Sequence, residues 1–102
     1  MPKFIMLSTL GPEGMHTLRE HPRRLKEVNA EVEAMGVKVL EQYALLGPYD
    51  FLTIVEAPDN ETVAHLSVDL GSRGTVHITT LPAIPIDSLV RKLGDAQQLG
   101  HS

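Results

Sequence analysis

The chain has 102 residues, a formal net charge of −4, 42% hydrophobic residues and no cysteine. This length predicts one small domain, and the acidic balance argues against nucleic acid or an anionic membrane as a partner. The lack of cysteine excludes disulfides, thiolate nucleophiles and zinc–thiolate sites. Neither a signal peptide nor an apolar run of membrane length is visible, so we predict a cytoplasmic protein.

The first third of the chain predicts a strand followed by a broken helix. Residues 3–10 are apolar on both sides of an extended segment. Apolar residues at spacings of three, four and seven follow, which indicates one buried helical stripe. Because Pro22 lies on this stripe and has no N–H, we predict a short helix near 12–20 and a longer one over 22–35, ended by Gly36.

The middle of the chain predicts a β-hairpin. Residues 37–46 and 49–57 are rich in β-branched, aromatic and other apolar residues. Between them stand Gly47 and Pro48, and proline presets the backbone angle at the second position of a tight turn. Two strands joined by so short a connection should pair antiparallel.

The last part of the chain predicts a helix, a strand and a short final helix. A helix over 59–71 would be capped by Asp59 or Asn60, since both side chains accept hydrogen bonds from first-turn N–H groups. Residues 75–82 then predict a fourth strand, and 85–93 a short helix.

The order strand–helix–strand–strand–helix–strand predicts an α+β, ferredoxin-like βαββαβ fold, with a four-stranded antiparallel sheet and helices on one face. Strands one and three are nevertheless apolar on both faces, as Phe4 with Ile5 and Phe51 with Leu52 show. A second copy packing sheet to sheet would cover the bare face and form a dimeric α/β barrel. We expect one domain over 1–93 and a disordered tail over 94–102.

Three residues are candidates for acid–base chemistry. His77 lies in the middle of the fourth predicted strand, on the face expected to carry Thr75 and Thr79, and could be a general base or a ligand. Tyr49 and Asp50 could form a polar pair at the mouth of a cavity. The alternatives are a packing histidine with one satisfied nitrogen, a tyrosine packed at the hairpin end and an aspartate that accepts turn N–H groups.

Other polar residues suggest binding rather than catalysis. Hydroxyls within apolar strands need a partner and could line a pocket, which predicts four ligand-binding residues: Ser8, Thr53, Thr75 and Thr79. Residues 71–74 could hold an anion through their backbone and Arg73, or simply end a helix. Arg23 and Arg24 are interpreted as part of a solvated helix face. We predict no metal and no cofactor.

Several segments together resemble the GYD-domain family. They are Gly47-x-Tyr49-Asp50 with Phe51, the run 55–58, the opening 2–5, Pro22-x-Arg24, and 76–81. The resemblance spans about residues 2–93 and implies a ferredoxin-like fold of the dimeric α/β-barrel superfamily. It implies no agreed activity and no catalytic residues, because related barrels include cofactor-free monooxygenases, haem enzymes, isomerases and amino-acid-sensing domains.

These observations predict a small homodimer, possibly a higher oligomer, that binds a small apolar ligand or serves as a sensing or assembly module. One alternative is a cofactor-independent monooxygenase or isomerase that uses His77 with Tyr49 or Asp50. A second alternative is a purely structural oligomerisation unit. Whether the protein is an enzyme stays open at this stage.

Overall fold

The computed structural model describes residues 1–95, so most of the predicted tail, residues 96–102, lies outside the described residues. The elements are β1 (Lys3–Leu10), α1 (Pro12–Glu20), α2 (Arg24–Ala34), β2 (Lys38–Ala44), β3 (Phe51–Glu56), α3 (Asn60–Gly71), β4 (Val76–Ala83) and α4 (Ile86–Leu93). Their order and type confirm the predicted sequence of strands and helices, including the break before α2.

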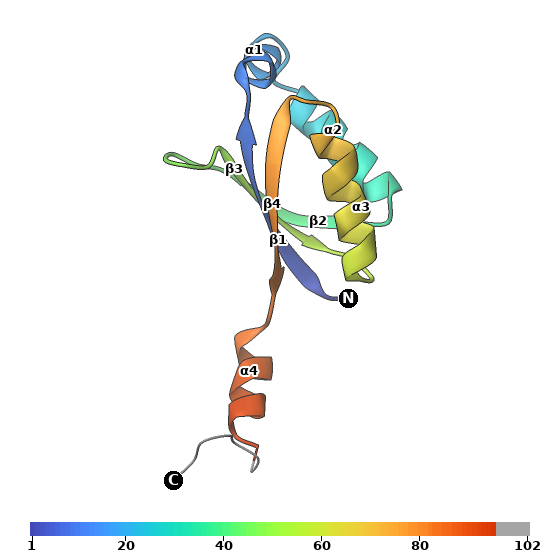
Figure 1. Cartoon of the computed structure of the whole chain (residues 1–102), viewed down its shortest axis with the longest axis vertical. Helices are drawn as coiled ribbons and strands as arrows, with labels where there is room; N and C mark the ends of the chain where they lie inside the picture. The colour runs from blue at the N-terminus through green and yellow to red at the C-terminus, as the bar shows by residue number, and fades with distance from the viewer. Residues whose placement is uncertain (96–102) are drawn as a thin grey trace.

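The four strands form one antiparallel sheet in the order β2-β3-β1-β4. The α+β, ferredoxin-like fold is therefore confirmed. Figure 1 shows α2 and α3 lying on the same side of the sheet, with α1 at the end where β1 finishes. The central strands are β1 and β3, and the edge strands are β2 and β4, so β1 pairs with both β3 and β4.

Local chemistry places the helix ends. Asp59 caps α3, because its Oδ1 atom accepts hydrogen bonds from the Thr62 N–H at 2.8 Å and from the Thr62 hydroxyl at 2.6 Å. The helix α2 is followed by Gly36, whose φ of 87° lies in the left-handed region that favours glycine. Both features were predicted from the residue types.

The hydrophobic core lies between the sheet and the helices. Its sheet side includes Phe4 and Met6 of β1 and Val55 of β3, all buried. Its helix side includes Val32 of α2 and Leu66 of α3. Since side chains alternate along a strand, the strand residues next to these in sequence point to the opposite face of the sheet.

The opposite sheet face has no helix against it in Figure 1. The register pairs Leu7 with Leu52, and Ile5 with Ile54, on this face, and all four side chains are only half-buried. Tyr43 lies beside them and is 52% exposed. Its hydroxyl donates to Glu41 at 2.7 Å, and this hydrogen bond raises the pKa of the Tyr43 phenol. We refer to this surface as the open sheet face.

The hairpin connection is longer than the tight turn that the sequence predicts. The strand β2 ends at Ala44 and β3 begins at Phe51, so a six-residue loop over 45–50 joins them. Gly47 in this loop has φ of 118°, and the neighbouring Leu46 is fully exposed.

The last helix, α4, stands apart from the sheet and the other helices (Figure 1). It follows β4 and extends along the long axis of the molecule, which measures 59 Å. Ile84 before the helix, and Ile86 and Val90 within it, are each at least 59% exposed. No helix within residues 1–95 is both long enough and apolar enough to cross a membrane.

Candidate functional site

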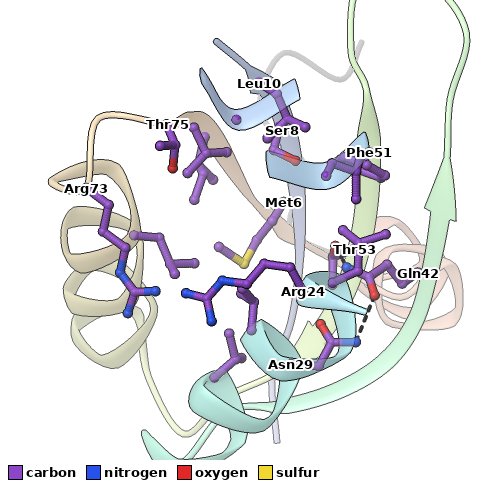
Figure 2. A pocket seen from close by; sticks show the side chains of 18 of the residues that line it. Met6, Ser8, Leu10, Arg24, Asn29, Gln42, Phe51, Thr53, Arg73 and Thr75 are labelled. Carbon is purple, nitrogen blue, oxygen red and sulfur yellow. Dashed lines mark hydrogen bonds between the residues drawn. The ribbon is translucent and has the colours of Figure 1, made fainter. Parts of the chain in front are cut away.

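A cavity of about 400 Å³ lies between the helix-bearing face of the sheet and the helices above it. Alternate residues of β1 and β3 form its floor, among them Met6, Thr53 and Val55, and α2 supplies Val28 from above. Cavities of this size fall in the range that holds small-molecule ligands in proteins. Figure 2 shows side chains from the sheet and the helices converging on this space.

Apolar side chains make up most of the wall, and the polar ones gather in small groups. Ser8 lies beside Leu10 in Figure 2, and Thr75 lies apart from them, toward the side of Arg73. On another side, Asn29 Nδ2 donates to Gln42 Oε1 at 2.8 Å, and Gln42 Nε2 donates to Thr53 Oγ1 at 3.3 Å. This short chain of hydrogen bonds connects α2, β2 and β3 at the edge of the cavity.

Two arginines line the cavity and share one carboxylate. Arg24 Nη1 lies 3.3 Å from Glu31 Oε1, and Arg73 Nη1 lies 2.7 Å from Glu31 Oε2. That second oxygen is shielded from solvent, and its contact with Arg73 is an ion pair without the alignment of a hydrogen bond. The interaction with Arg73, reinforced by Arg24, lowers the pKa of Glu31. Glu31 therefore joins the start of α2 to the turn after α3.

Three of the four predicted ligand-binding residues, Ser8, Thr53 and Thr75, line this cavity. The fourth, Thr79, does not, because it pairs with Leu7 and so belongs to the open sheet face. Thr75 was expected to share a face with Thr79 and His77, and that expectation is wrong. It precedes β4, so the alternation of the strand does not apply to it.

His77 lies on the opposite side of the sheet from the cavity. It pairs with Thr9, is exposed, and contributes nothing to the cavity wall. The next residue, Ile78, is the one that points into the cavity. The convergence of His77 with Tyr49 and Asp50 on this cavity does not occur, because none of the three residues lines it.

Asp50 has a clear structural contact. Its Oδ2 atom accepts a hydrogen bond from the backbone N–H of Leu10 at 2.8 Å. Its own N–H donates to the carbonyl of Ser8 at 2.8 Å, and its carbonyl accepts from the N–H of Leu45 at 2.7 Å. Tyr49 is half-buried beside it. Asp50 thus binds the end of β1 to the loop over 45–50, and a catalytic role for it stays a prediction.

The sequence reasoning missed Arg24, which it placed on a solvated face. In the structure Arg24 is only half-exposed and lines the cavity, as do Asn29 and Gln42. Arg23, one position earlier, is exposed. The useful signal was the helical spacing of Arg24, Val28 and Glu31, which places the arginine beside the buried stripe. In the part of the chain that the structure describes, no group of three or more histidine, aspartate and glutamate residues could hold a metal ion.

The fold is shared with a solved structure described as the crystal structure of FFRP-DM1. The similarity has a TM-score of 0.56 at 20% sequence identity, and it covers 82% of this chain and all of the other. At this identity the likeness establishes the α+β fold and nothing about ligands or partners.

Sequence similarity is much more specific. The GYD domain matches residues 4–92. A protein from Thermus thermophilus, named "Glutamine synthetase and cystathionine beta-lyase binding protein", is 53% identical over 94 residues, which are 91% of this chain and 99% of the relative. The chain belongs to the GYD-domain family, as the residues around Gly47, Tyr49 and Asp50 indicated.

Proposed function

We propose that this protein is a homodimeric protein-binding module that docks onto metabolic enzymes, and that its partners are a glutamine synthetase and a cystathionine β-lyase. The observation that carries the proposal is the 53% identity to the Thermus protein named for binding these two enzymes, over nearly the whole length of both chains. At this identity, and with 91% of this chain and 99% of the relative aligned, we expect a binding surface to be retained along with the fold.

The composition of the cavity favours a binding module over an enzyme. Within residues 1–95, its polar lining consists of hydroxyl, amide and guanidinium groups, with no histidine or carboxylate to act as a base near neutral pH. His77, the candidate base of the enzyme alternative, stands on the other sheet face. The enzyme alternative therefore has no group in the cavity that suits general base catalysis.

Two features support the homodimer. The open sheet face carries Ile5, Leu7, Leu52 and Ile54, and no helix of residues 1–95 lies over them. The arm formed by residues 84–93 extends past the end of the sheet (Figure 1), and its exposed side chains include Ile84, Ile86 and Val90. In a two-fold symmetric dimer both features are used twice, with the sheets face to face and each arm against the partner subunit.

The area available fits a stable dimer. Ile84, Ile86, Leu89 and Val90 are 44–71% exposed, and burying one such side chain removes on the order of 100 Å² of apolar surface, equivalent to about 2.5 kcal/mol. Two arms would then bury about 800 Å², just short of the ~1,000 Å² that a biological interface needs. The open sheet faces supply the rest, so the proposal requires sheet and arm together.

The partner proposal is tested with purified glutamine synthetase and cystathionine β-lyase from the same organism, each immobilised for biolayer interferometry. We expect saturable binding to both, with a dissociation constant of about 10 μM or tighter, equivalent to about 7 kcal/mol. Glutamate dehydrogenase, another enzyme of amino-acid metabolism, is the control and should not bind. Binding to neither partner, or equal binding to all three enzymes, would refute the proposal.

The dimer is tested separately by light scattering after size exclusion. Ile54→Asp places a charge in the middle of the open sheet face and should convert the dimer to a monomer. Val68→Asp makes the same kind of change on the exposed side of α3, where Val68 is 70% exposed, and should leave the dimer intact. A monomeric wild-type protein, or dimers from both variants, would contradict the sheet-to-sheet arrangement.

A further inference from the structure

The cavity contains an anion-binding feature that protein docking does not use. Arg24 comes from the first turn of α2 and Arg73 from the turn after α3, and they are the positively charged residues among those lining the cavity in the described chain. Figure 2 shows their guanidinium groups extending toward each other across the space below Met6. Two arginines from different elements that meet in a mostly apolar cavity are a recurring means of holding a carboxylate.

Two arginines and three carboxylates meet at this point, and only the arginines line the cavity. Glu31 is the closest acid, and its carboxylate offsets one of the two arginines. The other acids nearby are Glu27, 63% exposed and 3.2 Å from Arg24, and Asp69, 48% exposed and 3.6 Å from Arg73. Contacts of such exposed carboxylates are weak because water screens them. None of these three carboxylates lines the cavity, so among the described residues the two guanidinium groups face it with no counter-charge on that side.

Both arginines also have N–H donors that make no contact with these carboxylates. Both contacts of Arg24 with acids involve Nη1, which leaves its Nη2 and Nε atoms available to donate. Arg73 uses Nη1 for Glu31 and points Nη2 toward Asp69, which leaves its Nε available among the described residues. Because the Glu31 carboxylate already spans both arginines, one further carboxylate on the cavity side can reach both as well. Glu31 itself does not line the cavity.

The apolar side chains of the cavity wall favour an apolar group at the other end of a bound carboxylate. Val28 and Val32 of α2, Leu70 of α3, and Val55 and Ile78 of the sheet all face the cavity. Such a surface favours an unbranched or lightly branched hydrocarbon and rejects a second charged group.

We propose that the cavity binds a small amphipathic carboxylate, with its carboxylate held by Arg24 and Arg73 and its apolar body among the core side chains. The site goes beyond the proposed docking function and does not depend on it, because the cavity lies on the helix side of the sheet. The chemical class is a monocarboxylic acid with an apolar body of a few to about ten carbon atoms, which suits a cavity of this size.

The test is calorimetric titration of the wild-type protein with butyrate, hexanoate and octanoate, each compared with the matching amide. Hexanoate should bind about tenfold more tightly than hexanamide, because hydrogen bonds between charged groups are stronger than neutral ones by about 1–1.5 kcal/mol. Affinity should rise about fourfold per added methylene until the cavity is filled. Equal affinity for acid and amide, or no binding of any acid at about 10 mM, a limit of roughly 2.7 kcal/mol, would overturn the proposal.

Variants identify the residues. Arg24→Gln and Arg73→Gln should each weaken hexanoate binding about tenfold and hexanamide binding much less, since the hydrogen bond between two charged groups is the stronger one. Arg19→Gln is the matched control, because Arg19 is exposed on α1 and outside the cavity, and it should bind hexanoate like the wild type. If Arg19→Gln weakens binding as much as the other two, the effect is one of overall charge and the site is refuted. The wild-type comparison of acid with amide decides the matter even if a variant fails to fold.

Discussion

Replacing Asp50 with alanine should lower the free energy of unfolding, because its side chain supplies an acceptor that the sheet lacks. The strand β3 begins at Phe51, which pairs with Ser8, so no residue of β3 stands opposite Leu10. The carboxylate of Asp50 takes that place and accepts from the Leu10 N–H at 2.8 Å. Without it, a half-buried N–H at the end of β1 is left with no protein partner.

The size of the effect follows from the kind of bond. A hydrogen bond to a charged group contributes about 1.5–3 kcal/mol, and 1 kcal/mol shifts the Tm of a domain of this size by about 4–8 °C, so Asp50→Ala should lower the Tm by roughly 6–24 °C. Asp50→Asn retains an acceptor oxygen and should lose only about 1 kcal/mol. This pair of variants separates the acceptor from the charge.

Urea unfolding followed by circular dichroism measures both variants, at one fixed protein concentration because dimerisation would shift the apparent stability. Glu13→Ala, an exposed acid in the first turn of α1, is the control for loss of one negative charge. If Asp50→Ala unfolds within about 0.5 kcal/mol of the wild type, the explanation of Asp50 as a strand-end acceptor is wrong. If Asp50→Asn is as unstable as Asp50→Ala, the charge and not the acceptor is what matters.

Two further predictions concern the loop and the pH. Gly47→Ala should lower the free energy of unfolding by about 1–2 kcal/mol, because a φ of 118° is strained for alanine even though no atom lies within 4 Å of the new Cβ. Gly71→Ala, at the end of α3 and equally free of close atoms, is the control and should not destabilise the protein. Equal urea midpoints for the two variants would contradict this prediction. Hydrogen bonds from Thr62 lower the pKa of Asp59 in the folded protein. The ionised Asp59 therefore adds to the free energy of unfolding above the unfolded-state pKa of about 3.9, and this stabilisation is lost as the pH falls through the lower folded-state pKa. The stability difference between wild type and Asp59→Ala should therefore be full at neutral pH and shrink in strong acid; a constant difference would refute it.

Much of the architecture was predictable because it depends on local chemistry. Proline at position 22, glycine at 36 and aspartate at 59 act on the backbone within a few residues, so the helix ends follow from residue type alone. The apolar strands and their order then leave a ferredoxin-like sheet as the arrangement that buries them. The resemblance to the GYD domain rested on the same kind of local pattern, around Gly47 and Asp50.

The contents of the cavity could not be predicted in this way. Strand alternation alone does not say which side chains face the helices, and a shift of one residue reverses every assignment. Only the structure therefore shows that Ile78 faces the cavity and that His77 lies on the opposite face. Likewise, Arg24 and Arg73 are far apart in sequence, and only the packing of α2 and α3 on one sheet face brings both to Glu31. The sequence by itself determined the elements and the family, and the tertiary structure decided which side chains meet, since such meetings depend on long-range packing that no local pattern encodes.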